Sequence, residues 1–182
     1  MRTPGLLSDS YFNLPKFDVE AADAAYKEWG FNCGPAALCA VLGMRPEELR
    51  PYLGDFEKKK YLNPKLMYEV LSKFDNIRYS TKYRGDVPCA FPEIYYSLVR
   101  VQWGGPWTRQ GVPLPARQRH THWVAMQYFL KPFVFDINAI CCGGWICFKE
   151  WEKTMMPWLA RQCVPEWDGV IWPTHVIEIR RG

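Results

Sequence analysis

The chain has 182 residues, of which 48% are hydrophobic and 23% are charged, and its formal net charge is +4. This length is typical of one domain with a sizeable core, so we expect a single domain spanning residues 1–182. No stretch approaches the roughly 20 apolar residues of a membrane helix, and Lys and Arg are scattered among acidic residues, unlike the concentrated basic face of a nucleic-acid-binding protein.

The first part of the chain has helical patterns. Residues 1–20 read as an irregular arm, and residues 21–27 favour a helix. Residues 34–42 are small and apolar nearly all round, which is typical of a helix buried in the core. Gly43 is suited to end that helix, and a short helix is predicted within residues 45–53.

The next elements alternate between helix and strand. Asn63 followed by proline predicts a helix start, and apolar residues recur at helical spacing over residues 64–74. Residues 77–84 alternate like a strand, residues 92–97 suggest a helical turn, and residues 97–103 form the next predicted strand.

The second half of the chain is rich in predicted strands. Residues 121–130 and 132–138 flank a Lys-Pro turn and predict an antiparallel hairpin. A helix kinked or ended near Pro157 is predicted over residues 148–162, and residues 174–180 form a final strand. Helices followed by antiparallel strands indicate an α+β fold.

The strongest local signal is Cys33, which directly precedes the buried helix in the segment NCGPAAL. Unpaired N–H groups and the helix dipole favour an anion at this position and can lower the pKa of a thiol. A buried, unreactive thiol is the alternative interpretation. Cys39, well inside the same helix, fits that alternative better.

A nucleophilic thiol needs a base, and the chain has three histidines. His122 opens an apolar strand and is preferred over His120, which lies in a basic loop, whereas His175 is interpreted as structural. Asp136 follows one strand later, across the predicted hairpin, and would orient the imidazole of His122. Asn138 lies on the same strand face and is the alternative orienting residue.

The segments NCGPAAL, HWV and FDIN, in this order, resemble the papain-like cysteine peptidases. The similarity is greatest to the compact bacterial branch that includes the bacteriocin-leader-processing peptidases, and it spans about residues 27–140. It implies a papain-like fold in which Cys33 opens the central helix and His122 and Asp136 come from successive antiparallel strands. No metal or organic cofactor is implied.

The family usually places a Gln before the nucleophile to bind the oxyanion, and residues 26–29 contain none. The backbone N–H of Cys33 could supply one donor, with Asn32 or Gln102 as the second. Losing one such donor can cost roughly 100- to 1,000-fold in rate. Residues expected to contact substrate are Trp29, Gly34, Trp103, Trp107 and Trp123.

Two further segments invite other interpretations. Residues 103–120 form a long loop before His122, in which Trp103 and Trp107 could grip substrate and Arg117 or Arg119 could meet an acidic group. The cysteines at 141, 142, 147 and 163 could hold zinc, but their spacing does not match the usual ligand pairs. Residues 58–60 are three lysines, interpreted as a solvated charge run.

The sequence therefore predicts a thiol-dependent hydrolase that cleaves peptide or other amide bonds through a thioacyl-enzyme. A catalytically weak or inactive module that binds a peptide or protein partner is the alternative, as is an acyltransferase of transglutaminase type. Seven cysteines at irregular spacing, with no secretory signal at the N-terminus, favour a reducing cytoplasm. The sequence does not reveal the oligomeric state.

Overall fold

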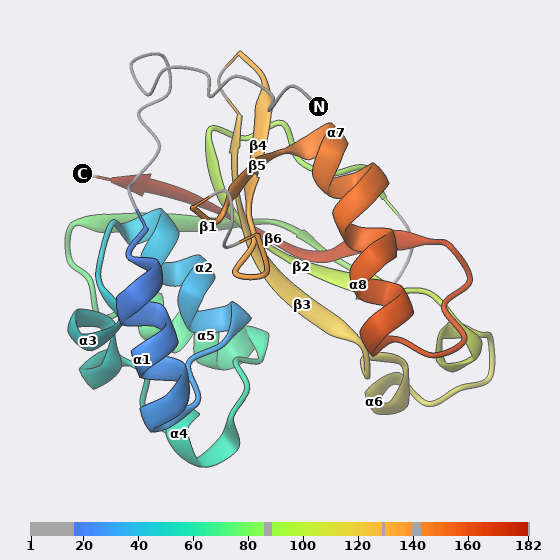
Figure 1. Cartoon of the computed structure of the whole chain (residues 1–182), viewed down its shortest axis with the longest axis horizontal. Helices are drawn as coiled ribbons and strands as arrows, with labels where there is room; N and C mark the ends of the chain where they lie inside the picture. The colour runs from blue at the N-terminus through green and yellow to red at the C-terminus, as the bar shows by residue number, and fades with distance from the viewer. Residues whose placement is uncertain (1–16, 86–88, 129, 140–142, 182) are drawn as a thin grey trace, which may run out of the picture.

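A six-stranded antiparallel sheet runs through the middle of the protein (Figure 1). The computed structural model describes residues 17–85, 89–128, 130–139 and 143–181. The helices of the first half cover one face of the sheet, and α8 with the turns before it covers the other (Figure 1). The predicted combination of helices with an antiparallel sheet is therefore confirmed.

The strands lie in the order β1-β6-β2-β3-β4-β5. Their bounds are Ile77–Arg84 (β1), Tyr96–Trp103 (β2), Thr121–Tyr128 (β3), Pro132–Phe135 (β4), Trp145–Cys147 (β5) and Ile171–Arg181 (β6). The predicted hairpin is formed by β3 and β4, with Ala125 opposite Phe135. The last strand of the chain enters the sheet between β1 and β2, so distant segments lie side by side.

The longer helices also fall where they were predicted. The α-helical segments are Val19–Trp29 (α1), Cys33–Leu42 (α2), Pro46–Leu49 (α3), Phe56–Lys59 (α4), Pro64–Leu71 (α5), Leu114–Arg117 (α6), Phe148–Glu150 (α7) and Met156–Cys163 (α8). Short 3₁₀ turns cover Arg50–Tyr52 and Pro106–Thr108, and a π-helical turn, Trp151–Met155, joins α7 to α8. Asn63 caps α5 by accepting a hydrogen bond from the backbone N–H of Leu66 at 2.8 Å.

Two sequence predictions were wrong in detail. Residues 91–95 are irregular and β2 begins at Tyr96, so no helical turn spans 92–97. Pro92 and the following Ile-Tyr-Tyr run favour extended backbone, which the pairing of β2 with β3 then completes. The predicted arm also extended too far, because α1 already begins at Val19; residues 1–16 lie outside the described residues.

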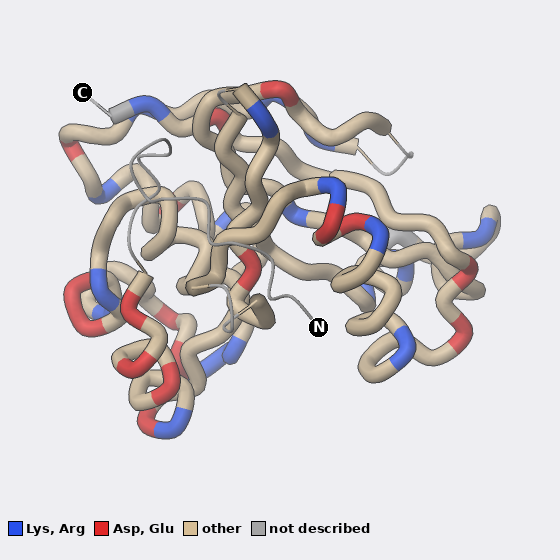
Figure 2. The backbone as a smooth tube through the Cα atoms, turned by 45° about the horizontal axis from the view of Figure 1, so that its top comes forward, with Lys and Arg blue, Asp and Glu red and all other residues tan. Residues whose placement is uncertain are grey.

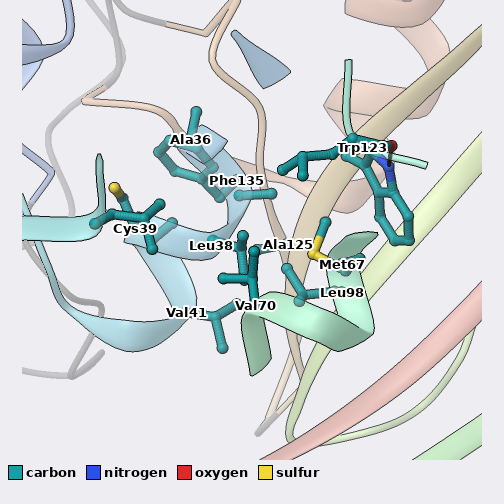
Figure 3. Packing of buried hydrophobic residues seen from close by; sticks show 14 of the residues in the cluster. Ala36, Leu38, Cys39, Val41, Met67, Val70, Leu98, Trp123, Ala125 and Phe135 are labelled. Carbon is teal, nitrogen blue, oxygen red and sulfur yellow. Dashed lines mark hydrogen bonds between the residues drawn. The ribbon is translucent and has the colours of Figure 1, made fainter. Parts of the chain in front are cut away.

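Two hydrophobic clusters lie on the two faces of the sheet. Because successive strand residues point to opposite faces, Leu98 packs with the first-half helices and Val99 packs with α8. Figure 3 shows the first cluster, where Leu38 of α2 and Val70 of α5 lie close to Leu98. Helix α2 is thus buried nearly all round, and its first residue is held against the sheet.

Gly34 fixes how closely α2 approaches the segment before α5. A Cβ atom at this position would lie 2.8 Å from both Cβ and Cδ1 of Leu62, which is closer than such contacts allow. The prediction that Gly34 lets the backbone approach substrate is therefore corrected: its missing side chain makes room for Leu62. This contact sets the position of Cys33, the preceding residue.

We expect Gly34→Ala to lower the free energy of unfolding by about 1–3 kcal/mol, although alanine normally favours a helix over glycine, because the clash with Leu62 outweighs propensity. Urea unfolding of Gly34→Ala, Leu62→Ala and the double variant measures this change in the free energy of unfolding. In Gly34→Ala/Leu62→Ala the two losses should be less than additive, because the second substitution removes Cγ and Cδ1 of Leu62 and leaves only its Cβ close to the new side chain. Additive losses would show that the contact is not the cause.

The charged residues do not form a single basic face. Lys and Arg alternate with Asp and Glu along the helices of the first half (Figure 2). Among the described residues, no helix is both long enough and apolar enough to cross a membrane.

Candidate active site

The segment before α2 is held in place by a cap and by Lys60. The side chain of Asn32 accepts a hydrogen bond from the backbone N–H of Gly34 at 3.3 Å and donates to the carbonyl oxygen of Lys60 at 2.9 Å. The ammonium of Lys60 donates to the carbonyl of Trp29 at 2.8 Å, and this lysine adopts a left-handed φ of 60°. The predicted solvated charge run thus contains a residue that fixes the entry to α2.

Cys33 is the first residue of α2 and is half-buried. Its sulfur accepts a hydrogen bond from the backbone N–H of Trp123 in β3 and interacts with the imidazole of His122. The first N–H groups of a helix have no partner within the helix, so the end of α2 adds positive potential at this sulfur. The surroundings of Cys33 are those that stabilise a thiolate.

His122 is the second residue of β3 and is buried, with 7% of its surface exposed. Its Nε2 atom lies 3.0 Å from Oδ1 of Asp136, although the ring N–H does not aim straight at that oxygen. The ring of Trp103 packs against it with 5.8 Å between the ring centres. The imidazole therefore lies between the sulfur of Cys33 and a carboxylate.

Asp136 directly follows β4 and is fully buried. Its Oδ1 accepts hydrogen bonds from the backbone N–H and the side-chain amide of Asn138, both at 2.9 Å. Asn138, predicted as an alternative orienting residue, thus contacts the carboxylate of Asp136. The structure places Asp136 next to the histidine, in the position predicted for it.

Trp151 is the contact that sequence reasoning missed. It is fully buried, and its indole N–H donates to Oδ2 of Asp136 at 2.9 Å. Trp151 begins the π-helical turn between α7 and α8, and such turns are frequent at functional sites. Pro157 lies just beyond this turn and has no N–H for the helical ladder, which accounts for the predicted irregularity near this residue.

The three groups change one another's acidity. Burial by itself would raise the pKa of Cys33, but the charge and hydrogen bond of His122 outweigh it, and the pKa is lowered. Burial opposes protonation of His122, yet the charges of Asp136 and Cys33 raise its pKa well above the usual range. Burial likewise opposes ionisation of Asp136, but His122 and Trp151 hold its pKa below its ordinary value. All three shifts act in the direction of a thiolate, an imidazolium and a carboxylate.

Cys39 provides the contrast within the same helix. It is buried inside α2, and burial together with the charges of Glu47 and Glu48 raises the pKa of its thiol. This agrees with the interpretation of Cys39 as a packing residue. Burial also raises the pKa of Cys89.

A pocket of about 490 Å³ opens at Cys33, a volume typical of small-molecule and peptide-side-chain sites. Its lining includes Asn32, Cys33 and His122, with Tyr26, Ile137 and Trp158 around them. Tyr26 belongs to α1 and Trp158 to α8, so the two helical layers both contribute to the pocket (Figure 1). Neither aromatic residue was singled out from the sequence.

The residues predicted as oxyanion donors differ in whether their N–H groups are available. Gln102 is buried, and its amide nitrogen donates to the carbonyls of Trp103 and His120 at 2.9 and 3.0 Å. Both amide hydrogens are used, so the prediction of Gln102 as a donor is corrected. Asn32 lines the pocket but is engaged as a helix cap. The backbone N–H of Cys33, at the first helical position, is the donor that the helix leaves unused.

Two tryptophans predicted to contact substrate are core residues instead. Trp29 is 2% exposed and packs edge-on against the rings of Phe31 and Phe56. Trp123 is 4% exposed, and its indole N–H donates to the carbonyl of Leu62 at 2.7 Å. Both residues are close in sequence to site residues, as predicted. Their side chains, however, point into the first hydrophobic cluster, because burying an aromatic ring contributes strongly to the stability of a core.

The long loop before β3 does not line the pocket in the described residues. Trp103 is buried against His122, and Trp107 donates its indole N–H to the carbonyl of Trp103 at 2.9 Å. Arg117 donates to the carbonyl of Val112 and lines a separate small cavity. The prediction that Trp103 and Trp107 of this loop grip substrate is therefore corrected: the ring of Trp103 packs against the imidazole of His122 instead.

The proposed zinc ligands are only partly described. Cys141 and Cys142 lie outside the described residues, whereas Cys147 is half-buried and Cys163 is exposed. Within the described part of the chain, no group of three or more His, Cys, Asp or Glu residues is arranged to hold a metal ion.

Comparisons with protein-family models, with curated proteins and with solved structures gave no match for this chain.

Proposed function

We propose that this protein is a cysteine hydrolase of papain-like type that cleaves peptide or other amide bonds. The observation that carries the proposal is the alignment of Cys33, His122 and Asp136 beside an open pocket, with the thiol at the start of a buried helix. A nucleophile, a base and a group that orients the base are the three parts that covalent acyl transfer requires. The order of these residues along the chain is also that of the papain-like peptidases.

In the proposed mechanism the thiolate of Cys33 attacks the carbonyl carbon, and a C–S bond forms as the carbonyl oxygen becomes an oxyanion. The backbone N–H of Cys33 stabilises this charge. The imidazolium of His122 gives its proton to the leaving nitrogen, and the C–N bond breaks to leave a thioacyl-enzyme. Neutral His122 then takes a proton from water, whose oxygen attacks the thioester and releases the acid and the thiolate. Asp136 holds the ring and stabilises its charged form.

We expect iodoacetamide to modify Cys33 well below the pH at which ordinary thiols react. Because the pKa of Cys33 is lowered, its thiolate persists as the pH falls and is lost only below that lowered value. A thiol of ordinary pKa would be about 100-fold less ionised at pH 6.5 than at a pH above its pKa. Alkylation rates of each cysteine, followed by peptide mass spectrometry between pH 5 and 9, measure the difference. Cys39 is the internal control, because its pKa is raised.

The test continues with an activated ester or anilide substrate. A thioacyl adduct on Cys33, trapped at low pH and absent from Cys33→Ala, would support the hydrolase. Release of the acyl group to an added amine, rather than to water, would indicate an acyltransferase. Equal slow alkylation of every cysteine would contradict the proposal.

A binding module that uses the same pocket is the second candidate. It is favoured by one observation: the amide of Gln102 has both hydrogens in structural hydrogen bonds, and that of Asn32 donates one of its two to the carbonyl of Lys60, which leaves few oxyanion donors. A reactive Cys33 that never forms a thioacyl adduct would support this candidate.

A further inference from the structure

Two exposed aromatic side chains lie at the candidate active site and have no evident structural role. Tyr26 is 65% exposed and Trp158 is 55% exposed. Neither belongs to either hydrophobic cluster of the described residues. Both line the pocket that contains Cys33 and His122.

The helices that carry them explain why these rings face the pocket. On α1, Ala22, Ala25 and Trp29 are buried, and Tyr26 lies one turn after Ala22 on the face that lines the pocket, where Ala22 also contributes. On α8, Met156, Leu159 and Ala160 are buried against the sheet, and Trp158 points away from them. The two rings come from the two layers that lie on either side of the sheet (Figure 1).

The remainder of the pocket is apolar or neutral apart from its reacting groups. Phe31 and Ile137 are also among its lining residues and contribute apolar surface. Among the described lining residues there is no Lys or Arg, and the acidic one, Asp23, is paired with Lys27. Apart from the imidazole of His122, a carboxylate or phosphate on the substrate would find no cationic side chain among these lining residues, whereas an apolar ring would find two aromatic faces.

We propose that Tyr26 and Trp158 form an aromatic clamp that binds an apolar or aromatic side chain of the substrate next to the scissile amide bond. This inference rests on the proposed hydrolase, because it assigns the substrate class of the same site. Exposed aromatic rings lose contact with water when they bind such a group, which supplies binding free energy directly beside the nucleophile. The clamp therefore selects substrates by the residue that flanks the bond to be cut.

The test compares two reagents on Cys33. Iodoacetamide reports the thiolate alone, and N-phenethyl-iodoacetamide carries the same reactive carbon with an added ring. In the wild type we expect the aromatic reagent to react about 10- to 100-fold faster than iodoacetamide, once both rates are divided by those for a free thiol. A third reagent, with a carboxymethyl group in place of the ring, should show no such gain.

Variants of Tyr26 and Trp158 test whether these two rings cause the faster reaction of the aromatic reagent. Tyr26→Ala and Trp158→Ala should each reduce the ratio of aromatic to small-reagent rates by about 5-fold or more, and Tyr26→Phe should restore most of it. Tyr95→Ala is the matched control, because Tyr95 is 51% exposed but directly precedes β2, at the end of that strand away from His122. It should keep the wild-type ratio.

The outcomes separate the clamp from the hydrolase. If iodoacetamide labels Cys33 rapidly at low pH but the aromatic reagent gains nothing, the clamp is wrong and the hydrolase stands. A ratio that falls equally in Tyr95→Ala would also overturn the clamp. Slow labelling by iodoacetamide at low pH would overturn the hydrolase itself.

Discussion

Replacing His122 with alanine should slow the alkylation of Cys33 at pH 6.5 by about 100-fold or more. Burial opposes ionisation of this thiol, and the charge and hydrogen bond of His122 are the largest effects that overcome it. Without them the pKa returns to the ordinary range of about 8.5 or rises above it. The pH–rate profile of iodoacetamide labelling should therefore lose its low-pH reaction, and hydrolysis should disappear.

His120→Ala is the matched control for this prediction. His120 lies two residues earlier, and its ring packs against Trp107 with 4.4 Å between the ring centres, outside the pocket. Its pKa is lowered by partial burial and by the charge of Arg119, both of which favour the neutral imidazole. His122→Gln tests the same point if the alanine variant fails to fold, because it keeps a polar group beside Asp136. Equal losses in the His120 and His122 variants would show that the imidazole of His122 is not the partner of the thiol.

The local part of the site could be predicted from the sequence because it depends on neighbouring residues. Asn32 and Pro35 mark a helix start around Cys33, and Asp136 follows His122 by one strand of a hairpin with a short turn. Caps and hairpins are set by contacts within a few residues, so their signals can be read from one sequence. The sequence alone, however, could not show the direction of each side chain.

The tryptophans show why side-chain directions were missed. Trp29 and Trp123 lie next to the site in sequence, and both rings point into the core. Trp151 fell within the helix predicted over residues 148–162, and only the tertiary fold brings its N–H to Asp136, 15 residues away in sequence. Trp158 lies about one helical turn beyond the π-helical segment, and it too reaches the pocket only because of the tertiary fold.

The topology of the sheet was likewise beyond local reasoning. Strand β6 pairs with both β1 and β2, so residues near 175 lie beside residues near 84 and 100. Strands β1 and β6 pair although their residues are about 90 positions apart in the sequence. A single sequence carries no pattern that predicts which of two such distant strands will pair. The left-handed backbone of Lys60 is a smaller case, because lysine rarely adopts it and nothing in the charge run predicts it.

Replacing Asp136 with asparagine should lower the pKa of His122 and slow Cys33 alkylation at pH 6.5 by about 10- to 1,000-fold. The buried imidazole remains charged because Asp136 and Cys33 offset the cost of burial. Asparagine keeps the shape but removes the charge. The measurements are the pH–rate profile of labelling and a ¹H–¹⁵N titration of the imidazole. A labelling profile unchanged from wild type would contradict an orienting role for Asp136.

Trp151→Phe separates the charge of Asp136 from its position. The carboxylate accepts three hydrogen bonds, from Trp151 and from two groups of Asn138, so an asparagine amide must turn its NH₂ toward at least one donor. We expect Trp151→Phe to retain the charge and most of the low-pH labelling, but to slow hydrolysis by about 10-fold, the cost of one hydrogen bond to a charged group. In Asp136→Asn/Trp151→Phe the effect of Trp151 on hydrolysis should vanish, because it acts only through the carboxylate. An effect of the same size in both backgrounds would mean that Trp151 supports the site through packing alone.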